Sequence, residues 1–141
     1  MTAKRILMPE YFDSTVAVSA IFPGSTNYAD ASARLKAAGD GAYIINHGVA
    51  EVFRTLTGRL KLPPKAAAQL VKGVLLARFK EAALSREDYA AVIKGMADKG
   101  LSGPIIYDAL HAAGARKIGA AFINTYNRDH FSKVAPDLKV I

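Results

Sequence analysis

Acidic side chains are the residues of this sequence best suited to catalysis, because the other common catalytic groups are absent or lack their usual motifs. The chain has no cysteine, which excludes a thiolate nucleophile and a thiolate metal site. Its three histidines form no His-x-x-x-His or His-Glu-x-x-His pair, so a zinc site is not indicated. No Gly-x-Ser-x-Gly nucleophile turn and no phosphate-binding loop ending in Gly-Lys-Ser or Gly-Lys-Thr occurs. The twelve acidic residues therefore remain as the candidates.

Asp108 is the most informative of these carboxylates. It lies in the segment Ile105-Ile-Tyr-Asp-Ala-Leu110, which is predicted to be helical and is apolar on nearly every side. A carboxylate on such a face must be paired or must bind a metal, because burying it alone costs too much free energy. An ion pair with Arg116 or Lys117, or a helix edge that is simply wet, would also explain it.

Asp13 and Glu51 are the next candidates. Asp13 follows Tyr11 and Phe12 at the end of a predicted strand and precedes a predicted helix, where it could serve only as a helix cap. Glu51 lies on a second predicted helix, off the main apolar stripe. Taken alone, Glu51 is most simply interpreted as a solvated residue that pairs with Arg54 or Thr55.

The segment from Asn124 to Phe131 is dense in polar side chains directly after a buried strand. Asn127 and Asp129 could ligate a metal or orient a metal-bound water, or they could cap a short final helix. Carboxylates on several separate elements favour a hard cation, since oxygen ligands suit Mg²⁺ and Mn²⁺. These ions promote phosphodiester hydrolysis by orienting a water and by neutralising charge on the phosphate.

The elements that must position these residues alternate between strands and helices. We expect strands at about 10–13, 42–45, 119–124 and 138–141, and helices after residue 13, after a cap at Asn46, at about 65–78, after a capping sequence at Ser85 to Asp88, and from about 102 to 115. This order predicts a parallel sheet with helices on both faces. Functional groups of such sheets gather at the carboxyl ends of the strands, where Asp13 and residues 125–129 fall.

The length and the net charge of the chain limit the number of domains and the kind of partner. The 141 residues fit one domain, and 51% are hydrophobic, enough for a substantial core. Neither a membrane span nor a signal peptide is predicted, so we expect a cytoplasmic protein without membrane contact. The net charge of +7 would suit a polyanion such as RNA, although it could serve solubility alone. A loose basic cluster consists of Arg54, Arg59, Lys61 and Lys65.

Four segments, in order along the chain, resemble the motifs of the PIN-domain family of ribonucleases. Tyr11-Phe-Asp-Ser-Thr-Val-Ala-Val-Ser-Ala20 resembles the opening motif, in which a strand ends on Asp followed by Ser or Thr. Residues 49–56 and 100–116 resemble the segments that supply the second and third acids, and residues 122–131 resemble the closing motif. The resemblance covers nearly the whole chain from Glu10 onward.

The resemblance implies a three-layer α/β/α domain over residues 10–141, with residues 1–9 as an N-terminal extension. It implies an Mg²⁺- or Mn²⁺-dependent ribonuclease, similar to a VapC toxin, that forms a homodimer and is held inactive by a protein antitoxin. A non-catalytic PIN-like module that binds RNA or protein is the alternative. The implied site consists of Asp13, Glu51 and Asp108 as catalytic metal ligands, Asp129 as a further catalytic acid, and Thr125 and Asn127 as orienting residues.

Two expectations about geometry follow. Asp13, Glu51 and Asp108 should converge at one end of the sheet. If RNA is the substrate, basic side chains should rim this acidic cluster and make RNA binding depend on salt. The basic residues expected there are Arg54, Arg116, Lys117 and Arg128.

Overall fold

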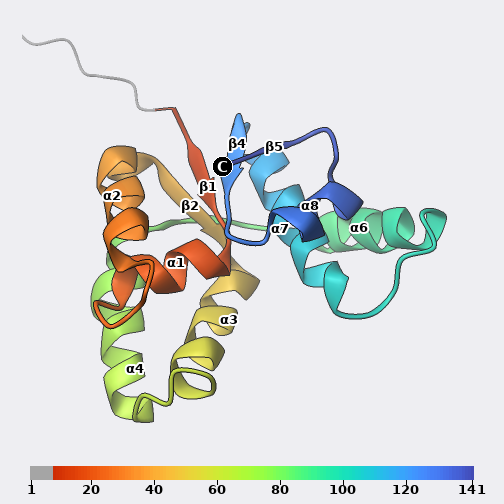
Figure 1. Ribbon diagram of the computed structural model, residues 1–141. Helices are drawn as coiled ribbons and strands as arrows, with labels where there is room; N and C mark the ends of the chain where they lie inside the picture. The colour runs from red at the N-terminus through yellow and green to blue at the C-terminus, as the bar shows by residue number, and fades with distance from the viewer. Residues whose placement is uncertain (1–7) are drawn as a thin grey trace, which may run out of the picture.

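The computed structural model describes residues 8–141 (Figure 1). Residues 1–7, which make up most of the predicted N-terminal extension, lie outside the described residues. The centre of the fold is a sheet of five parallel strands in the order β3-β2-β1-β4-β5. The strands are β1 (Glu10–Phe12), β2 (Ala42–Ile45), β3 (Lys80–Ala82), β4 (Phe122–Asn124) and β5 (Lys139–Val140).

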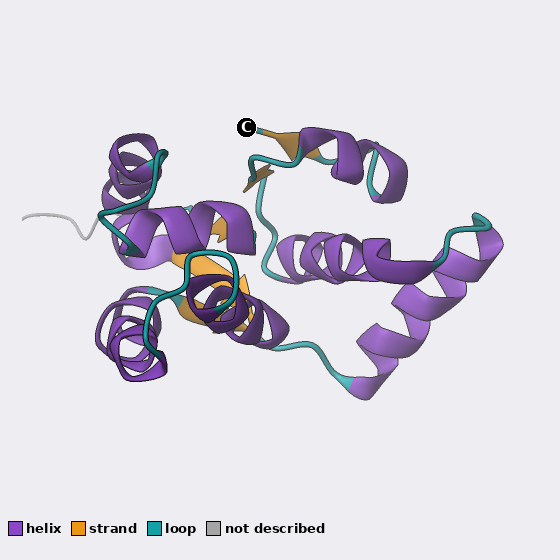
Figure 2. Ribbon diagram, turned by 60° about the horizontal axis from the view of Figure 1, so that its bottom comes forward, coloured by secondary structure: helices purple, strands orange, loops and turns teal. Residues whose placement is uncertain are grey.

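Helices cover both faces of this sheet (Figures 1 and 2). One face carries α1 (Ser14–Ile21), α2 (Tyr28–Ala38), α3 (Asn46–Thr57), α4 (Pro64–Leu70) and α5 (Leu76–Arg78). The other face carries α6 (Arg86–Asp98), α7 (Ile106–Lys117) and α8 (Arg128–Val134). The predicted three-layer α/β/α fold with a parallel sheet is therefore confirmed. Within residues 8–141, no helix combines the length and the apolar character needed to cross a membrane.

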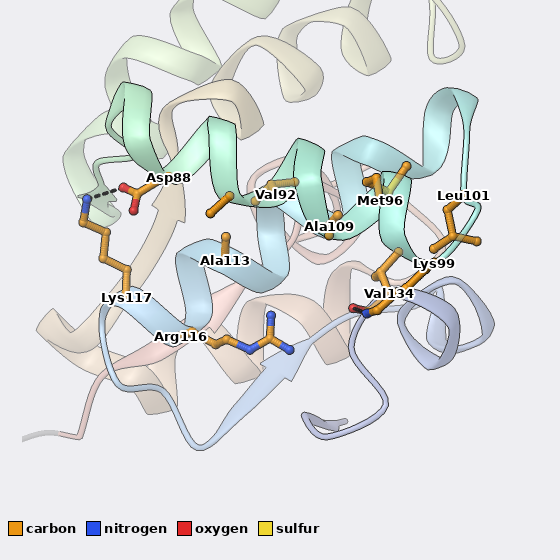
Figure 3. A pocket seen from close by; sticks show the side chains of 12 residues that line it. Asp88, Val92, Met96, Lys99, Leu101, Ala109, Ala113, Arg116, Lys117 and Val134 are labelled. Carbon is orange, nitrogen blue, oxygen red and sulfur yellow. Dashed lines mark hydrogen bonds and ion pairs between the residues drawn. The ribbon is translucent and has the colours of Figure 1, made fainter.

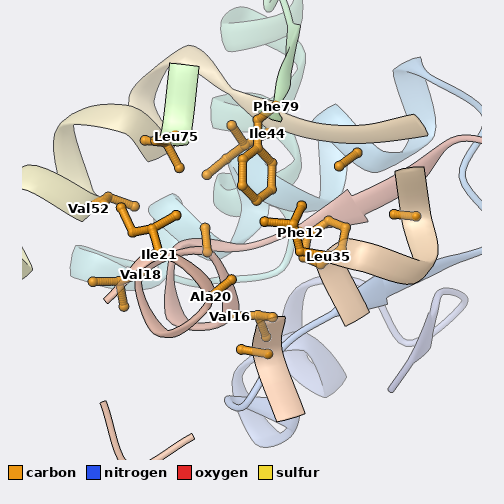
Figure 4. Close-up of a cluster of buried hydrophobic side chains, with 14 of the residues drawn as sticks. Phe12, Val16, Val18, Ala20, Ile21, Leu35, Ile44, Val52, Leu75 and Phe79 are labelled. Atoms are coloured by element: carbon orange, nitrogen blue, oxygen red, sulfur yellow. The ribbon is translucent and has the colours of Figure 1, made fainter. Parts of the chain in front are cut away.

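A layer of helices can pack on each face of the sheet because successive side chains of a strand point to opposite faces. On β1, Tyr11 points toward the layer of α6, α7 and α8, whereas Phe12 points toward α1 and α2. Phe12 is fully buried and packs edge to face on Phe79, with ring centroids 5.3 Å apart (Figure 4). Val16, Leu35 and other aliphatic side chains close this cluster. Each face of the sheet thus has its own apolar core.

Most predicted elements are present. The strand before Asp13 with the helix after it, the strand at 42–45 and the capping box of Ser85 and Asp88 are all confirmed. The predicted helix at 65–78 is continuous but contains a π turn at Val71–Leu75. Asn46 is not a helix cap, because it is the first residue of α3 and its side chain makes no capping hydrogen bond. Helix α2 and strand β3 were not predicted.

The order of the strands creates the place for a functional site. The chain runs from β1 outward through β2 to β3, and it then crosses to β4 on the other side of β1. Such a reversal opens a crevice between two neighbouring strands at their carboxyl ends. At this point the backbone N–H of Asp13, after β1, donates to the carbonyl of Asn124, the last residue of β4 (3.0 Å). Asp13 and Thr125 therefore lie side by side.

Candidate active site

Asp13 is the one buried carboxylate among the described residues, with 2% of its surface exposed. Its Oδ1 accepts hydrogen bonds from the backbone N–H groups of Thr15 (3.0 Å) and Val16 (3.2 Å), which makes it the cap of α1. Burial raises the pKa of Asp13, and the charge of His111 and the hydrogen bonds to the carboxylate offset only part of this rise. Asp13 is therefore a helix cap and, at the same time, an electrostatically unfavourable buried acid.

Two threonine hydroxyls hold the Asp13 carboxylate in place. Thr15 Oγ1 donates to Oδ1 (2.6 Å), and Thr125 Oγ1 donates to Oδ2 (2.5 Å). Both hydroxyls also accept a backbone N–H from the segment after β4: Thr15 from Tyr126 (3.1 Å) and Thr125 from Asn127 (2.9 Å). Each oxygen of the Asp13 carboxylate thus accepts a hydrogen bond from a threonine hydroxyl that a backbone N–H holds in place. Asp13 therefore has a defined orientation.

Asp108 lies in the first turn of α7, and 16% of its side chain is exposed. Its Oδ2 is 3.1 Å from Nδ1 of His130, so its partner is this histidine and not Arg116 or Lys117. Burial raises the pKa of Asp108; the charges of His130 and His111 lower it, and the charge of Asp13 raises it further. Asp13 is therefore close enough to Asp108 to raise the pKa of Asp108 further.

Glu51, on α3, is paired with a residue from the opposite layer. Its Oε1 lies 2.6 Å from Nε2 of His111, so its partner is neither Arg54 nor Thr55. Burial raises the pKa of Glu51, but the hydrogen bond and the charge of His111 more than offset this effect, and the net result is a lowered pKa. Glu51 is therefore the carboxylate of the three that most readily stays ionised.

His111 connects these elements and was not identified from the sequence. The imidazole is 1% exposed and joins Glu51 at Nε2 to the hydroxyl of Tyr11 at Nδ1 (2.6 Å). The Tyr11 hydroxyl accepts the backbone N–H of Ile45 (3.2 Å), so its own hydrogen points to Nδ1. In the neutral form of the imidazole, this network places the ring hydrogen on Nε2, from which it is donated to Glu51. The sequence did contain a signal for its role: His111 follows Asp108 by three residues, and residues three apart lie on the same face of a helix.

Two glycines allow the layers to approach closely enough for these contacts. A Cβ on Gly114 of α7 would lie 2.3 Å from Cγ2 of Ile45, and one on Gly48 of α3 would lie 2.7 Å from Cγ1 of Ile44 and 3.1 Å from Cε1 of His111. Neither position leaves room for a methyl group. The missing side chains let α7 lie against the sheet and let His111 reach α3.

Asp13, Glu51 and Asp108 all lie near His111, which binds Glu51 and lowers the pKa values of the other two. Within residues 8–141, however, no three Asp, Glu or His side chains form a group arranged to hold a metal ion. Glu51, the third predicted ligand, is bound to His111, and its role as a metal ligand stays a prediction. Asp13 and Asp108 are two carboxylates whose charges interact, and oxygen donors of this kind would suit Mg²⁺, which binds one or two carboxylates and keeps several waters.

The residues after β4 lie beside this site. Asn127, Arg128 and Asp129 line a cavity of about 320 Å³ together with Thr125. Asp129 is exposed in the first turn of α8, and its carboxylate makes no hydrogen bond or ion pair with another described residue. Asn127 contacts the site through its backbone N–H, which donates to Thr125. The structure thus places Asp129 on the rim of the site, away from the hydrogen-bond network of Asp13.

The four basic residues expected around the acids divide into two pairs. Arg54 and Arg128 line cavities that also contain Thr15 and Thr125, the two threonines that bind Asp13. Arg116 and Lys117 do not rim the site, because they lie at the far end of α7, about 12 Å along the helix from Asp108 at a rise of about 1.5 Å per residue.

Arg116 and Lys117 line a separate pocket of about 450 Å³ between α6 and α7 (Figure 3). There Arg116 pairs with Asp137 (2.7 Å) and Lys117 with Asp88 (2.5 Å). The Lys117 ammonium and the capping contacts hold the pKa of Asp88 down at about 2. Both basic side chains are therefore engaged in surface ion pairs and are not available to a ligand at the acidic site.

Fold and site together define an α/β/α domain whose acidic groups gather where β1 and β4 end. Residues 11–136 match the PIN domain family, and the chain belongs to this family. No curated protein matches the sequence. Among solved structures, the crystal structure of VapC20 of Mycobacterium tuberculosis, described as a sarcin-ricin loop cleaving toxin, is similar with a TM-score of 0.71 and 14% identity, over 86% of this chain and 92% of that chain. At this identity the similarity concerns the fold.

Proposed function

We propose that this protein is a metal-dependent endoribonuclease that hydrolyses phosphodiester bonds in single-stranded or structured RNA, and that it is the toxin of a toxin-antitoxin pair. The observation that carries the proposal is the buried Asp13 carboxylate, held by Thr15 and Thr125 beside Asp108. Membership of the PIN-domain family and a fold shared with an RNA-cleaving toxin support it.

Asp13 and Asp108 would hold the Mg²⁺ or Mn²⁺ ion. Burial raises the pKa of both carboxyl groups, and a neighbouring cation is what would favour their ionised forms. When bound, such an ion supplies charge neutralisation at the scissile phosphate and orients a water. The threonine hydroxyls on Asp13 keep its two oxygens in fixed directions, so that the carboxylate needs little reorganisation to act as a ligand.

Glu51 and His111 act on the water that attacks the phosphate. His111 fixes Oε1 of Glu51, and the other carboxylate oxygen accepts a hydrogen bond from the water. The lowered pKa of Glu51 keeps this acceptor ionised near neutral pH. Tyr11 in turn fixes the His111 ring, so both are positioning residues. Asp129, on the rim, would act only through water.

A non-catalytic PIN-like module that binds RNA or protein is the second candidate. The absence of a ready three-ligand group within residues 8–141 favours it. The two candidates differ in metal binding, since a ligand that binds only the folded state raises its stability by RT ln(1 + [L]/Kd). A melting temperature that rises with Mn²⁺ in the wild type, but not in Asp13→Asn, would support the enzyme. For the toxin we further propose a cytoplasmic location, a homodimer and a protein antitoxin as partner.

Cleavage of a labelled single-stranded RNA with Mn²⁺ tests the function. We expect Asp13→Asn and Asp108→Asn to lose nearly all activity, by about 100-fold or more, because each removes a ligand charge. Asp129→Asn should lose less. Asp98→Asn is the matched control, since this carboxylate is exposed on α6 and pairs only with Lys94. Full activity of Asp108→Asn would refute the assignment of the metal site.

A further inference from the structure

A cavity of about 390 Å³ between α1 and α3 lies beside the acidic site and has no role in the chemistry proposed above. Its polar lining consists of Ser14, Thr15, Arg54, Thr55 and Arg59. Thr15 also donates to Asp13, and Glu51 precedes Arg54 by three residues on α3, which places them on one side of the helix. The cavity therefore lies directly beside the residues that neighbour Asp13 and Glu51.

The charge of this cavity is positive. No carboxylate lines it, and neither Arg54 nor Arg59 forms an ion pair with an acid within residues 8–141. By contrast, Arg116 of the pocket between α6 and α7 pairs with Asp137 (2.7 Å), and Arg34 of the cavity after β4 pairs with Asp30 (2.9 Å). A guanidinium without a carboxylate partner presents a planar set of N–H donors that matches the oxygens of a phosphate.

The positive charge continues beyond the cavity. Helices α3 and α4 project together away from the sheet (Figure 1), and the turn that joins them carries Lys61, with Lys65 in the first turn of α4. Both lysines are exposed, as are Arg54 and Arg59. The four residues are the loose basic cluster of the sequence. In the structure they form a basic tract that runs from the acidic site to the tip of the α3–α4 pair.

We propose that the cavity between α1 and α3 binds a phosphodiester group of the RNA strand next to the one that is cut, with Arg54 and Arg59 as its charged ligands. This inference rests on the proposed ribonuclease function and identifies residues that bind the RNA substrate of that function. The hydroxyl of Thr55 lines the same cavity and can donate a further hydrogen bond to a phosphate oxygen. The strand then follows the tract toward Lys61 and Lys65, which favours a single strand several nucleotides long.

Binding of a fluorescent single-stranded RNA, followed by anisotropy in EDTA over a range of salt concentrations, tests the proposal without cleavage. We expect Arg54→Ala and Arg59→Ala each to weaken binding about tenfold at low salt. The slope of log K against log salt should fall by about 0.7 in the double variant, because the protein then neutralises one phosphate of the single strand fewer. Because both side chains are exposed, the melting temperature should not change.

Arg78→Ala is the matched control, since Arg78 is exposed at the end of α5, just before β3, and so lies toward the amino ends of the strands. It removes the same charge and should leave the slope unchanged. An unchanged slope in the double variant, or an equal change in Arg78→Ala, would overturn the proposal. Binding of polyglutamate as tight as that of RNA, and abolished in the double variant, would also overturn it and assign the cavity to an acidic peptide.

The failure of this inference can be told apart from the failure of the function. If the wild type cleaves RNA but the double variant binds RNA normally, the phosphate site is wrong and the nuclease stands. If the wild type does not cleave RNA although Arg54→Ala and Arg59→Ala weaken its binding, the site stands and the nuclease is wrong.

Discussion

Replacement of Tyr11 by phenylalanine removes a single oxygen from the centre of the hydrogen-bond network. The ring keeps its volume, so the change leaves no large cavity in the core. Tyr11 is fully buried, and its hydroxyl serves two groups: it accepts the N–H of Ile45 (3.2 Å) and donates to Nδ1 of His111 (2.6 Å). In Tyr11→Phe both groups are left without a partner in a place that water does not reach.

The expected decrease in stability follows from these two hydrogen bonds. A buried polar group left without a partner costs about 1–3 kcal/mol. The hydrogen bond to Ile45 is long, which places its share near the lower limit, so we expect the free energy of unfolding to fall by about 2–3 kcal/mol in total. For a domain of this size the melting temperature should fall by roughly 6–12 °C.

Urea unfolding in EDTA, followed by circular dichroism, measures this change. Tyr43→Phe is the matched control, because Tyr43 lies opposite Tyr11 on the neighbouring strand and its hydroxyl makes no hydrogen bond with a described residue. The control should change stability by less than about 0.5 kcal/mol. If Tyr11→Phe were as stable as Tyr43→Phe, the Tyr11 hydroxyl would not be what holds His111 in place.

Two further changes test the site and the packing. Burial raises the pKa of Asp13 in the folded state above its usual 3.8, so the contribution of Asp13 to the stability of the metal-free protein is fully present below about pH 4 and is lost as the pH rises through the raised pKa. Asp13→Asn carries no charge and should therefore gain stability over the wild type in EDTA between about pH 4 and pH 7; an equal difference at both pH values would contradict this. Gly114→Ala should lower the free energy of unfolding by at least about 1–3 kcal/mol, because its Cβ would meet Ile45 at 2.3 Å. Gly95→Ala on α6, with nothing within 4 Å, should instead raise it by up to about 1 kcal/mol, and urea unfolding measures both effects.

The fold was predictable where local patterns are strong. The buried strands β1 and β2 and the capping box of α6 all have clear signals in a short stretch of sequence. Helix α2 was missed because its buried side chains are only Ala31, Leu35 and Ala38, a weak apolar stripe. Strand β3 was missed because two of its three residues, Lys80 and Glu81, are charged and exposed at an edge of the sheet.

The site was predictable only in part, for a reason of distance along the chain. Asp13 and Asp108 stand out locally, as an acid at a strand end and an acid on an apolar helix. The residues that hold the acids in place lie far from them in the sequence: His111, the partner of Glu51, is 60 residues from Glu51 and 100 residues from Tyr11, which binds its ring. No local pattern indicates these contacts. The sequence therefore suggested neighbouring residues such as Arg54 as partners, where the tertiary structure supplies His111.

Strand β1 acquires its second neighbour, β4, long after the ribosome has made β1 itself. Thr125, which completes the contacts of Asp13, follows it by 112 residues. At about 5–20 residues per second, a ribosome needs roughly 6–22 s to make that stretch. During this time β1 can pair with β2 alone, and its other edge is open to pairing with other chains. The nascent chain thus carries an exposed sheet edge and an incomplete acidic site until Thr125 has been translated.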